Sequence, residues 1–106
     1  MTRALLARYR AQPGRGGDVE RNLRLMAERV ARDEPTCVLY RASRSIEEPD
    51  VFILYEEYVD QQALEAHRET PHFAELIEGT IVPILESRER EVLVPVVETS
   101  GEPGAA

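Results

Sequence analysis

The chain has 106 residues, of which 42% are hydrophobic and 31% charged, a composition typical of one folded domain. Its formal net charge of −7 disfavours nucleic acids and anionic membranes as partners, because both are polyanions. The single cysteine, Cys37, excludes an internal disulfide. The N-terminal segment mixes arginines with short apolar runs, so we expect neither a signal peptide nor a membrane span, and a cytoplasmic location.

A strand followed by a helix is predicted at the start of the chain. Residues 3–10 mix apolar and polar side chains and stop at the Pro13-Gly14 turn, which indicates a strand. The helix is predicted to be capped by Asp18 and to end near Asp33, before Pro35. Its apolar residues recur at the four-three-four spacing of one helical face: Val19, Leu23, Met26 and Val30.

Two strands are predicted next, separated by a polar turn at residues 47–50. Residues 36–42 are rich in β-branched and aromatic side chains, which favour strands. Residues 51–59 begin with a nearly continuous apolar run, which indicates burial on both faces. We therefore expect the second of these strands to be central in a sheet.

A second helical region is predicted in two pieces. Asp60 can cap a short helix that reaches His67, and Thr70-Pro71 can restart the helix, since proline at the first helical position loses no hydrogen bond. The restarted helix has an amphipathic face made of four residues: Phe73, Leu76, Ile77 and Ile81.

A last strand is predicted over residues 88–97, with Pro95 placing its end at an edge of the sheet, because proline cannot donate to a ladder. We place the folded domain at residues 1–97. Residues 98–106 contain few apolar side chains, and we expect them to form a flexible tail.

The predicted element order is strand, helix, strand, strand, helix, strand, which is the order of the ferredoxin-like α+β fold. Both helices should cover one face of a four-stranded antiparallel sheet. The other face then carries alternate residues of strands rich in leucine, valine, isoleucine and tyrosine, and a small protein rarely leaves such a face exposed. We expect a second copy to cover it and form a homodimer.

The only two histidines, His67 and His72, flank the same predicted helix break, which makes this stretch the first candidate for chemistry. His72 would lie in the first turn of a helix, where the dipole favours a neutral base, and His67 would lie at the end of a helix. The alternative is that both are polar groups of a surface or interface. A metal site formed with Glu56, Glu65 or Glu69 is disfavoured, since the histidine spacing does not place both on one helical face.

Glu56 and Tyr58 lie two residues apart on the predicted central strand and share a face with Phe52 and Leu54. A carboxylate on a mostly apolar face either pairs with an arginine or acts as an acid or base. We expect pairing, with Arg41 or Arg8 on a neighbouring strand as the partner.

The segment YEEYVD at residues 55–60, running into ALEAHRETPHF at residues 63–73, closely resembles the antibiotic biosynthesis monooxygenase family of dimeric α+β barrel proteins. Flanking pieces agree, and the resemblance extends from residue 3 to about residue 97. These pieces are CVLYRASRS at 37–45, EEPDVFILYE at 47–56 and IVPIL at 81–85.

The resemblance implies a ferredoxin-like monomer with a pocket between helices and sheet, and a cofactor-independent oxidation of a quinol or polycyclic aromatic phenol by O2. In such a reaction a base deprotonates the substrate, whose anion then gives an electron to oxygen. His67 or His72 would be the base, and Tyr58 a hydrogen-bond donor. The substrate would contact Phe52, Leu54, Glu56, Leu64 and Phe73.

Departures from the family also carry predictions. The haem-degrading branch resembles this chain least at Ala7, His67 and Ile77, so we expect no haem, and no other cofactor or metal. Two alternatives to the oxygenase remain open. One is a non-catalytic dimeric module that binds a small ligand or serves a stress response. The other is an isomerase or lyase that acts on a small keto compound without oxygen.

Overall fold

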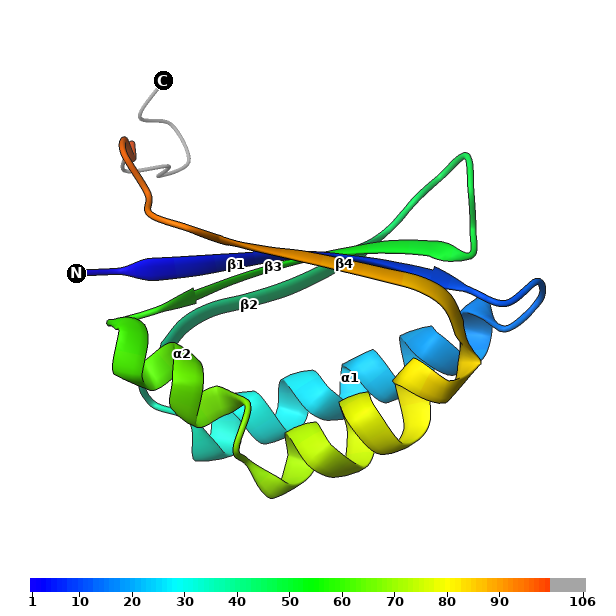
Figure 1. Ribbon diagram of the computed structural model, residues 1–106, viewed down its shortest axis with the longest axis horizontal. Coiled ribbons are helices and arrows are strands. Elements are labelled where there is room, and N and C mark those ends of the chain that lie inside the picture. Colours follow the sequence, from blue (N-terminus) through cyan, green and yellow to red (C-terminus); the bar gives the residue numbers. More distant parts are fainter. Residues whose placement is uncertain (100–106) are drawn as a thin grey trace.

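The protein is represented by a computed structural model, which describes residues 1–99. Helices on one side cover a four-stranded antiparallel sheet of order β2-β3-β1-β4 (Figure 1). This is the predicted ferredoxin-like α+β fold. The strands are β1 (Arg3–Ala11), β2 (Cys37–Arg44), β3 (Val51–Tyr58) and β4 (Leu85–Leu93). The helices are α1 (Gly16–Asp33), α2 (Gln61–His67), the π-helix η1 (Phe73–Ile81) and the 3-10 turn η2 (Val82–Ile84).

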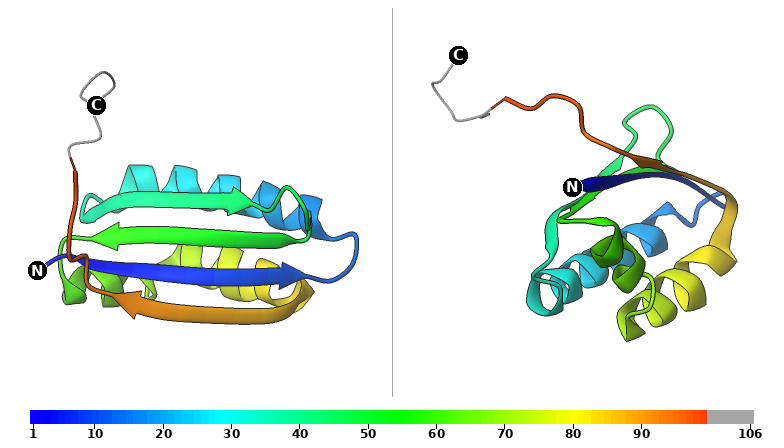
Figure 2. Two further views of the ribbon diagram at one scale, coloured as in Figure 1. Left: turned by 90° about the horizontal axis from the view of Figure 1, so that it is seen from above. Right: turned by 60° about the vertical axis from the view of Figure 1, so that its left-hand side comes forward.

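Figure 2 shows β3 and β1 in the middle of the sheet, with the helices on one side of it. Along both strands, residues alternate between buried positions that face the helices and more exposed positions on the outer face. On the helix side, β3 places buried apolar residues beside two polar ones, Glu56 and Tyr58. The main core lies between this face and the helices α1 and η1, as their contacts show. Between residues 1 and 99 there is no helix with the length and apolar character that a membrane crossing needs.

Helix α1 begins earlier than predicted. Its first residue is Gly16, and the capping role expected of Asp18 is wrong. The carboxylate of Asp50, from the turn before β3, accepts the backbone N–H groups of Gly14 at 3.2 Å and Gly16 at 3.1 Å. Asp18 instead pairs with Arg15 and Arg21. The start of the helix is thus set by a residue distant in sequence, whereas its end at Asp33 agrees with the prediction.

The second helical region has the predicted break but an unpredicted helix type. Asp60 caps α2, accepting the N–H of Ala63 at 2.8 Å. The chain then turns and restarts as the π-helix η1 rather than as a regular α-helix. In η1 the hydroxyl of Thr80 donates to the carbonyl of Glu75 at 2.9 Å, which suits its wider turns.

Strand β4 begins before the predicted residue 88 and ends before Pro95. It starts at Leu85, which pairs with Ala11 beyond an irregularity in β1. Pro95 has no N–H to continue the ladder, and residues 94–99 form no regular structure. The flexible tail was expected at residues 98–106, and its residues 100–106 lie outside the described part of the chain.

Candidate functional site

The break between α2 and η1 turns both histidines inward. His67 is the last residue of α2, and His72 lies just before η1. Thr70 fixes the intervening turn: its hydroxyl donates to the carbonyl of His67 at 2.8 Å and accepts the N–H of Phe73 at 3.2 Å. The predicted role of Thr70 as a cap is therefore confirmed. Both imidazoles are buried, with exposed fractions of 2% for His67 and 4% for His72.

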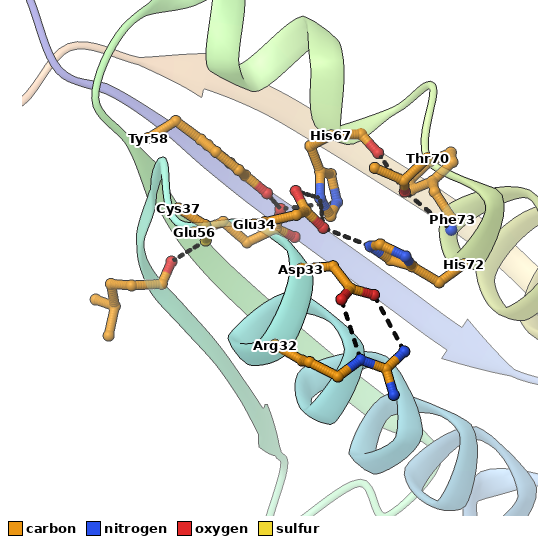
Figure 3. A network of polar contacts seen from close by, with 11 residues as sticks. Arg32, Asp33, Glu34, Cys37, Glu56, Tyr58, His67, Thr70, His72 and Phe73 are labelled. Atoms are coloured by element: carbon orange, nitrogen blue, oxygen red, sulfur yellow. Dashed lines mark hydrogen bonds and ion pairs between the residues drawn. The ribbon is translucent and has the colours of Figure 1, made fainter.

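Both imidazoles contact one carboxylate, that of Glu34, which follows the last residue of α1 (Figure 3). His67 Nδ1 lies 2.9 Å from Glu34 Oε1 and 3.1 Å from Oε2, and His72 Nε2 lies 2.6 Å from Oε2. Glu34 is itself 9% exposed. Three segments of the chain therefore meet at this side chain: the end of α1, the end of α2 and the start of η1.

Sequence reasoning missed Glu34, the residue that joins the two histidines. One signal in the sequence was available, because Glu34 stands at the C-terminal end of a helix, where the dipole disfavours a negative charge. An acid in such a place needs compensation from donors, and the two histidines supply it.

The second carboxylate, Glu56, joins the same network from β3. Tyr58 donates its hydroxyl to Glu56 Oε1 at 2.6 Å, and His67 Nε2 lies 3.6 Å from that oxygen. Both residues are buried, with Glu56 3% and Tyr58 0% exposed. The predicted pairing of Glu56 with Arg41 or Arg8 is wrong. In the strand register Arg41 lies opposite Tyr55 and Arg8 opposite Ile53, so both belong to the outer face.

The two carboxylates are biased toward opposite charge states. Burial raises the pKa of Glu34, but the hydrogen bonds from His67 and His72 outweigh it and leave that pKa below the ordinary value. Burial raises the pKa of Glu56 above its ordinary value, although His67 and Tyr58 oppose the shift. For Tyr58, burial and then the charge of Glu56 raise the pKa, so its hydroxyl remains a donor.

These charges fix where His67 can take a proton. An ionised Glu34 only accepts hydrogen bonds, so His67 Nδ1 carries a hydrogen toward it. In the neutral imidazole the lone pair is then on Nε2, the atom that faces Glu56. The arrangement is that of a histidine held in one tautomer by a carboxylate, with its other nitrogen available as a base.

A small gap adjoins His67 and Glu56. Its volume of about 10 Å³ suits a single water-sized group. Tyr40 and Phe73 are among its walls, and their rings lie 6.0 Å and 5.4 Å from the His67 ring, centre to centre. A larger cleft of about 560 Å³ lies between α1 and β2, reaching Tyr40 but neither histidine.

The structure brings together most, but not all, of the residues predicted for the site. His67, His72, Tyr58 and Glu56 form one hydrogen-bonded cluster around Glu34, and Phe73 packs against His67. Of the other predicted contact residues, Phe52 and Leu54 lie away from this cluster and Leu64 borders it at Tyr58. Phe52 lines the larger cleft, Leu54 belongs to the main core, and Leu64 packs in a cluster with Tyr58.

One further group near the site is the thiol of Cys37, which packs against the cluster that contains Tyr58. Burial raises the pKa of Cys37 to about 11, which keeps it a thiol, and its Sγ donates to the carbonyl of Leu39. Over residues 1–99, no three His, Cys, Asp or Glu side chains are arranged to hold a metal ion.

The chain matches the family model described as antibiotic biosynthesis monooxygenase over residues 2–79. A comparison with curated protein sequences gave no match.

Solved structures are similar over nearly the whole chain. Rv0793 from Mycobacterium tuberculosis is 26% identical, with 94% of this chain and 100% of that one covered and a TM-score of 0.83. PA3566 from Pseudomonas aeruginosa is 27% identical, with 91% and 95% covered and a TM-score of 0.80. A crystal structure named antibiotic biosynthesis monooxygenase is 26% identical, with 92% and 100% covered and a TM-score of 0.81.

Proposed function

Because the chain belongs to the antibiotic biosynthesis monooxygenase family, we propose that it oxidises an electron-rich phenol or quinol with O2 and without a bound cofactor. The observation that carries this proposal is the buried cluster in which Glu34 orients His67 beside a gap of hydroxyl size. A substrate hydroxyl in that gap would lie next to His67, and the ring would lie outside the gap, on the side where the lining residues Arg68 and Arg90 are exposed.

In the proposed reaction His67 accepts the hydroxyl proton, and the resulting anion gives an electron to O2. This electron transfer leaves a substrate radical and superoxide, which combine to form a carbon–oxygen bond. His67 returns its proton to the peroxide, and the ring carbon that carries the peroxide loses its hydrogen as a proton. Cleavage of the oxygen–oxygen bond then leaves one oxygen atom on the ring and releases the other, with these two protons, as water. A quinol and O2 thus yield a hydroxyquinone and water, so the substrate supplies all the electrons.

The other members of the cluster have supporting roles in this proposal. Glu34 stabilises the imidazolium that forms on His67. His72 shares the Glu34 carboxylate, which makes it a positioning residue rather than the base. Glu56, whose pKa is raised by burial, lies 3.6 Å from His67 Nε2 and can hold a proton beside it, and the Tyr58 hydroxyl donates to Glu56 and keeps it in place.

The first test is oxygen consumption by the purified protein with a reduced naphthoquinol or with anthrone. His67→Ala should lower kcat/KM by about 100-fold or more, the usual contribution of a positioned base. Added imidazole should restore part of the rate to His67→Gly, since it can occupy the vacated space. The exposed Glu65→Ala on the same helix should have the rate of the unchanged protein.

Other results would point to the alternatives. Oxygen consumption unchanged by His67→Ala would rule out the proposed base. Binding of the naphthoquinol without any oxygen consumption would favour a non-catalytic binding module. Turnover of a small keto compound under nitrogen would indicate the isomerase or lyase. Circular dichroism of each variant verifies that a lost rate is not a lost fold.

We also propose that two chains associate through the outer face of the sheet into a cytoplasmic homodimer. This face carries Leu6 and Ile53, which are each 36% exposed at the centre of the sheet. Leu6 and Ile53 line one hollow on this face, and a contiguous exposed apolar patch often marks a protein–protein interface. Sedimentation equilibrium should give about twice the 12.0 kDa of one chain, and Ile53→Lys should reduce that mass to the monomer. A monomeric unchanged protein would contradict the proposal.

A further inference from the structure

Three arginines gather around the gap beside His67. Arg68 follows the last residue of α2, and Arg88 and Arg90 lie two apart on β4. In the strand register Arg88 is opposite Tyr9 and Arg90 opposite Ala7, both of which face the helices. All three arginines line the gap together with His67 and Glu56.

These arginines are only partly neutralised. Arg88 pairs with Glu78 at 3.0 Å and lies 5.9 Å from the centre of the Tyr9 ring. Arg68 lies 6.0 Å from the centre of the Phe73 ring. Within residues 1–99, neither Arg68 nor Arg90 forms an ion pair. Partial burial, followed by the repulsion of Arg68 and Arg88, lowers the pKa of Arg90.

Of the acids near these arginines, only Glu78 forms an ion pair with one of them within residues 1–99. Glu56 lines the gap as well, and one of its carboxylate oxygens is engaged by the hydroxyl of Tyr58. Glu65, Glu69 and Glu78 line a separate surface hollow together with Arg68. Glu89 and Glu91 line another hollow together with Arg90. In a chain with a net charge of −7, a group of like positive charges beside a buried site is unfavourable unless an anion binds there.

We propose that this group of arginines, Arg68, Arg88 and Arg90, binds a carboxylate on the substrate, so that the substrate class is a hydroxylated aromatic carboxylate. The inference rests on the proposed function, because it places the substrate hydroxyl at His67. A guanidinium presents paired donors that match the two oxygens of a carboxylate. Arg90, which is exposed, lines the gap and forms no ion pair within residues 1–99, is the main contact.

The test compares two probes that differ only in the carboxylate, 1,4-dihydroxy-2-naphthoate and 1,4-dihydroxynaphthalene. Their affinities are measured by calorimetry under nitrogen, where no oxidation occurs. The unchanged protein should bind the carboxylate at least tenfold more tightly. Arg90→Gln should weaken binding of the carboxylate probe about tenfold, since a charge-assisted hydrogen bond contributes on this scale. It should change the affinity for the neutral probe by less than about twofold. Arg68→Gln should have a smaller effect in the same direction.

Arg29→Gln is the matched control, because Arg29 is an exposed residue of α1 whose replacement changes the net charge equally. It should alter neither affinity. The proposal would be overturned if the unchanged protein bound both probes equally or bound neither. It would also be overturned if Arg90→Gln and Arg29→Gln lost the same affinity for the carboxylate probe. Selective binding of the carboxylate without oxygen consumption in air would contradict the oxygenase alone, so the two failures are distinguishable.

Discussion

Glu34→Ala is expected to lower the free energy of unfolding by about 2–6 kcal/mol, because each of two buried donors left without an acceptor costs about 1–3 kcal/mol. The substitution leaves the ring N–H groups of His67 and His72 buried without an acceptor. It also releases the contact that joins α1 to both sides of the helix break. Urea unfolding followed by circular dichroism measures the change.

The neighbouring acid provides a control for Glu34. Asp33 is exposed and pairs only with Arg32, so Asp33→Ala should leave the urea midpoint nearly unchanged. Glu34→Gln should lose less stability than Glu34→Ala, because an amide oxygen can still accept from one of the histidines. Equal midpoints for Glu34→Ala and Asp33→Ala would mean that the cluster contributes nothing to stability.

Glu56→Gln is expected to become more stable than the unchanged protein as the pH rises above about 4.5, the ordinary value for a glutamate. The pKa of Glu56 is higher in the folded state than in the unfolded state. Its contribution to stability is therefore complete below the unfolded pKa and is lost as the pH rises through the folded pKa. Glutamine resembles the neutral acid and keeps an acceptor for Tyr58, so it escapes this loss.

Glu34 provides the comparison of opposite sign. Its folded pKa is lowered, so its contribution is complete above about 4.5 and is lost as the pH falls through the folded pKa. The stability advantage of the unchanged protein over Glu34→Gln should therefore shrink as the pH falls. Urea midpoints from pH 3 to pH 8 measure both variants. Parallel pH profiles for the unchanged protein and Glu56→Gln would contradict the assignment of Glu56.

The sequence predicted the order of elements, because amphipathic spacing and turn residues are local signals. It also located the helix break, since Asp60 and Thr70 cap helices through bonds to residues three positions away. It could not distinguish the π-helix from an α-helix, because nine residues are too few for periodicity to separate the two. The start of α1 depends on Asp50, which lies 34 residues after Gly16, and no local pattern reports such a contact.

The candidate site shows the same limit. Alternation along β3 correctly placed Glu56 and Tyr58 on one face, but the partner of Glu56 depends on which elements pack there. The two histidines stood out by their position at the break. Their common acceptor, Glu34, lies 33 and 38 residues away, and only the packing of α1 against the break brings it near.

The attachment of both sides of the break to Glu34 also bears on how fast a substrate can enter. Moving α2 away from η1 would sever buried hydrogen bonds, a motion of microseconds or longer. The exposed side chains of Arg68 and Arg90 at the gap can instead rotate within nanoseconds. If a substrate enters where these side chains move aside, the helices need not move. The rate of binding would then be limited by diffusion of the substrate to the site rather than by opening of the protein.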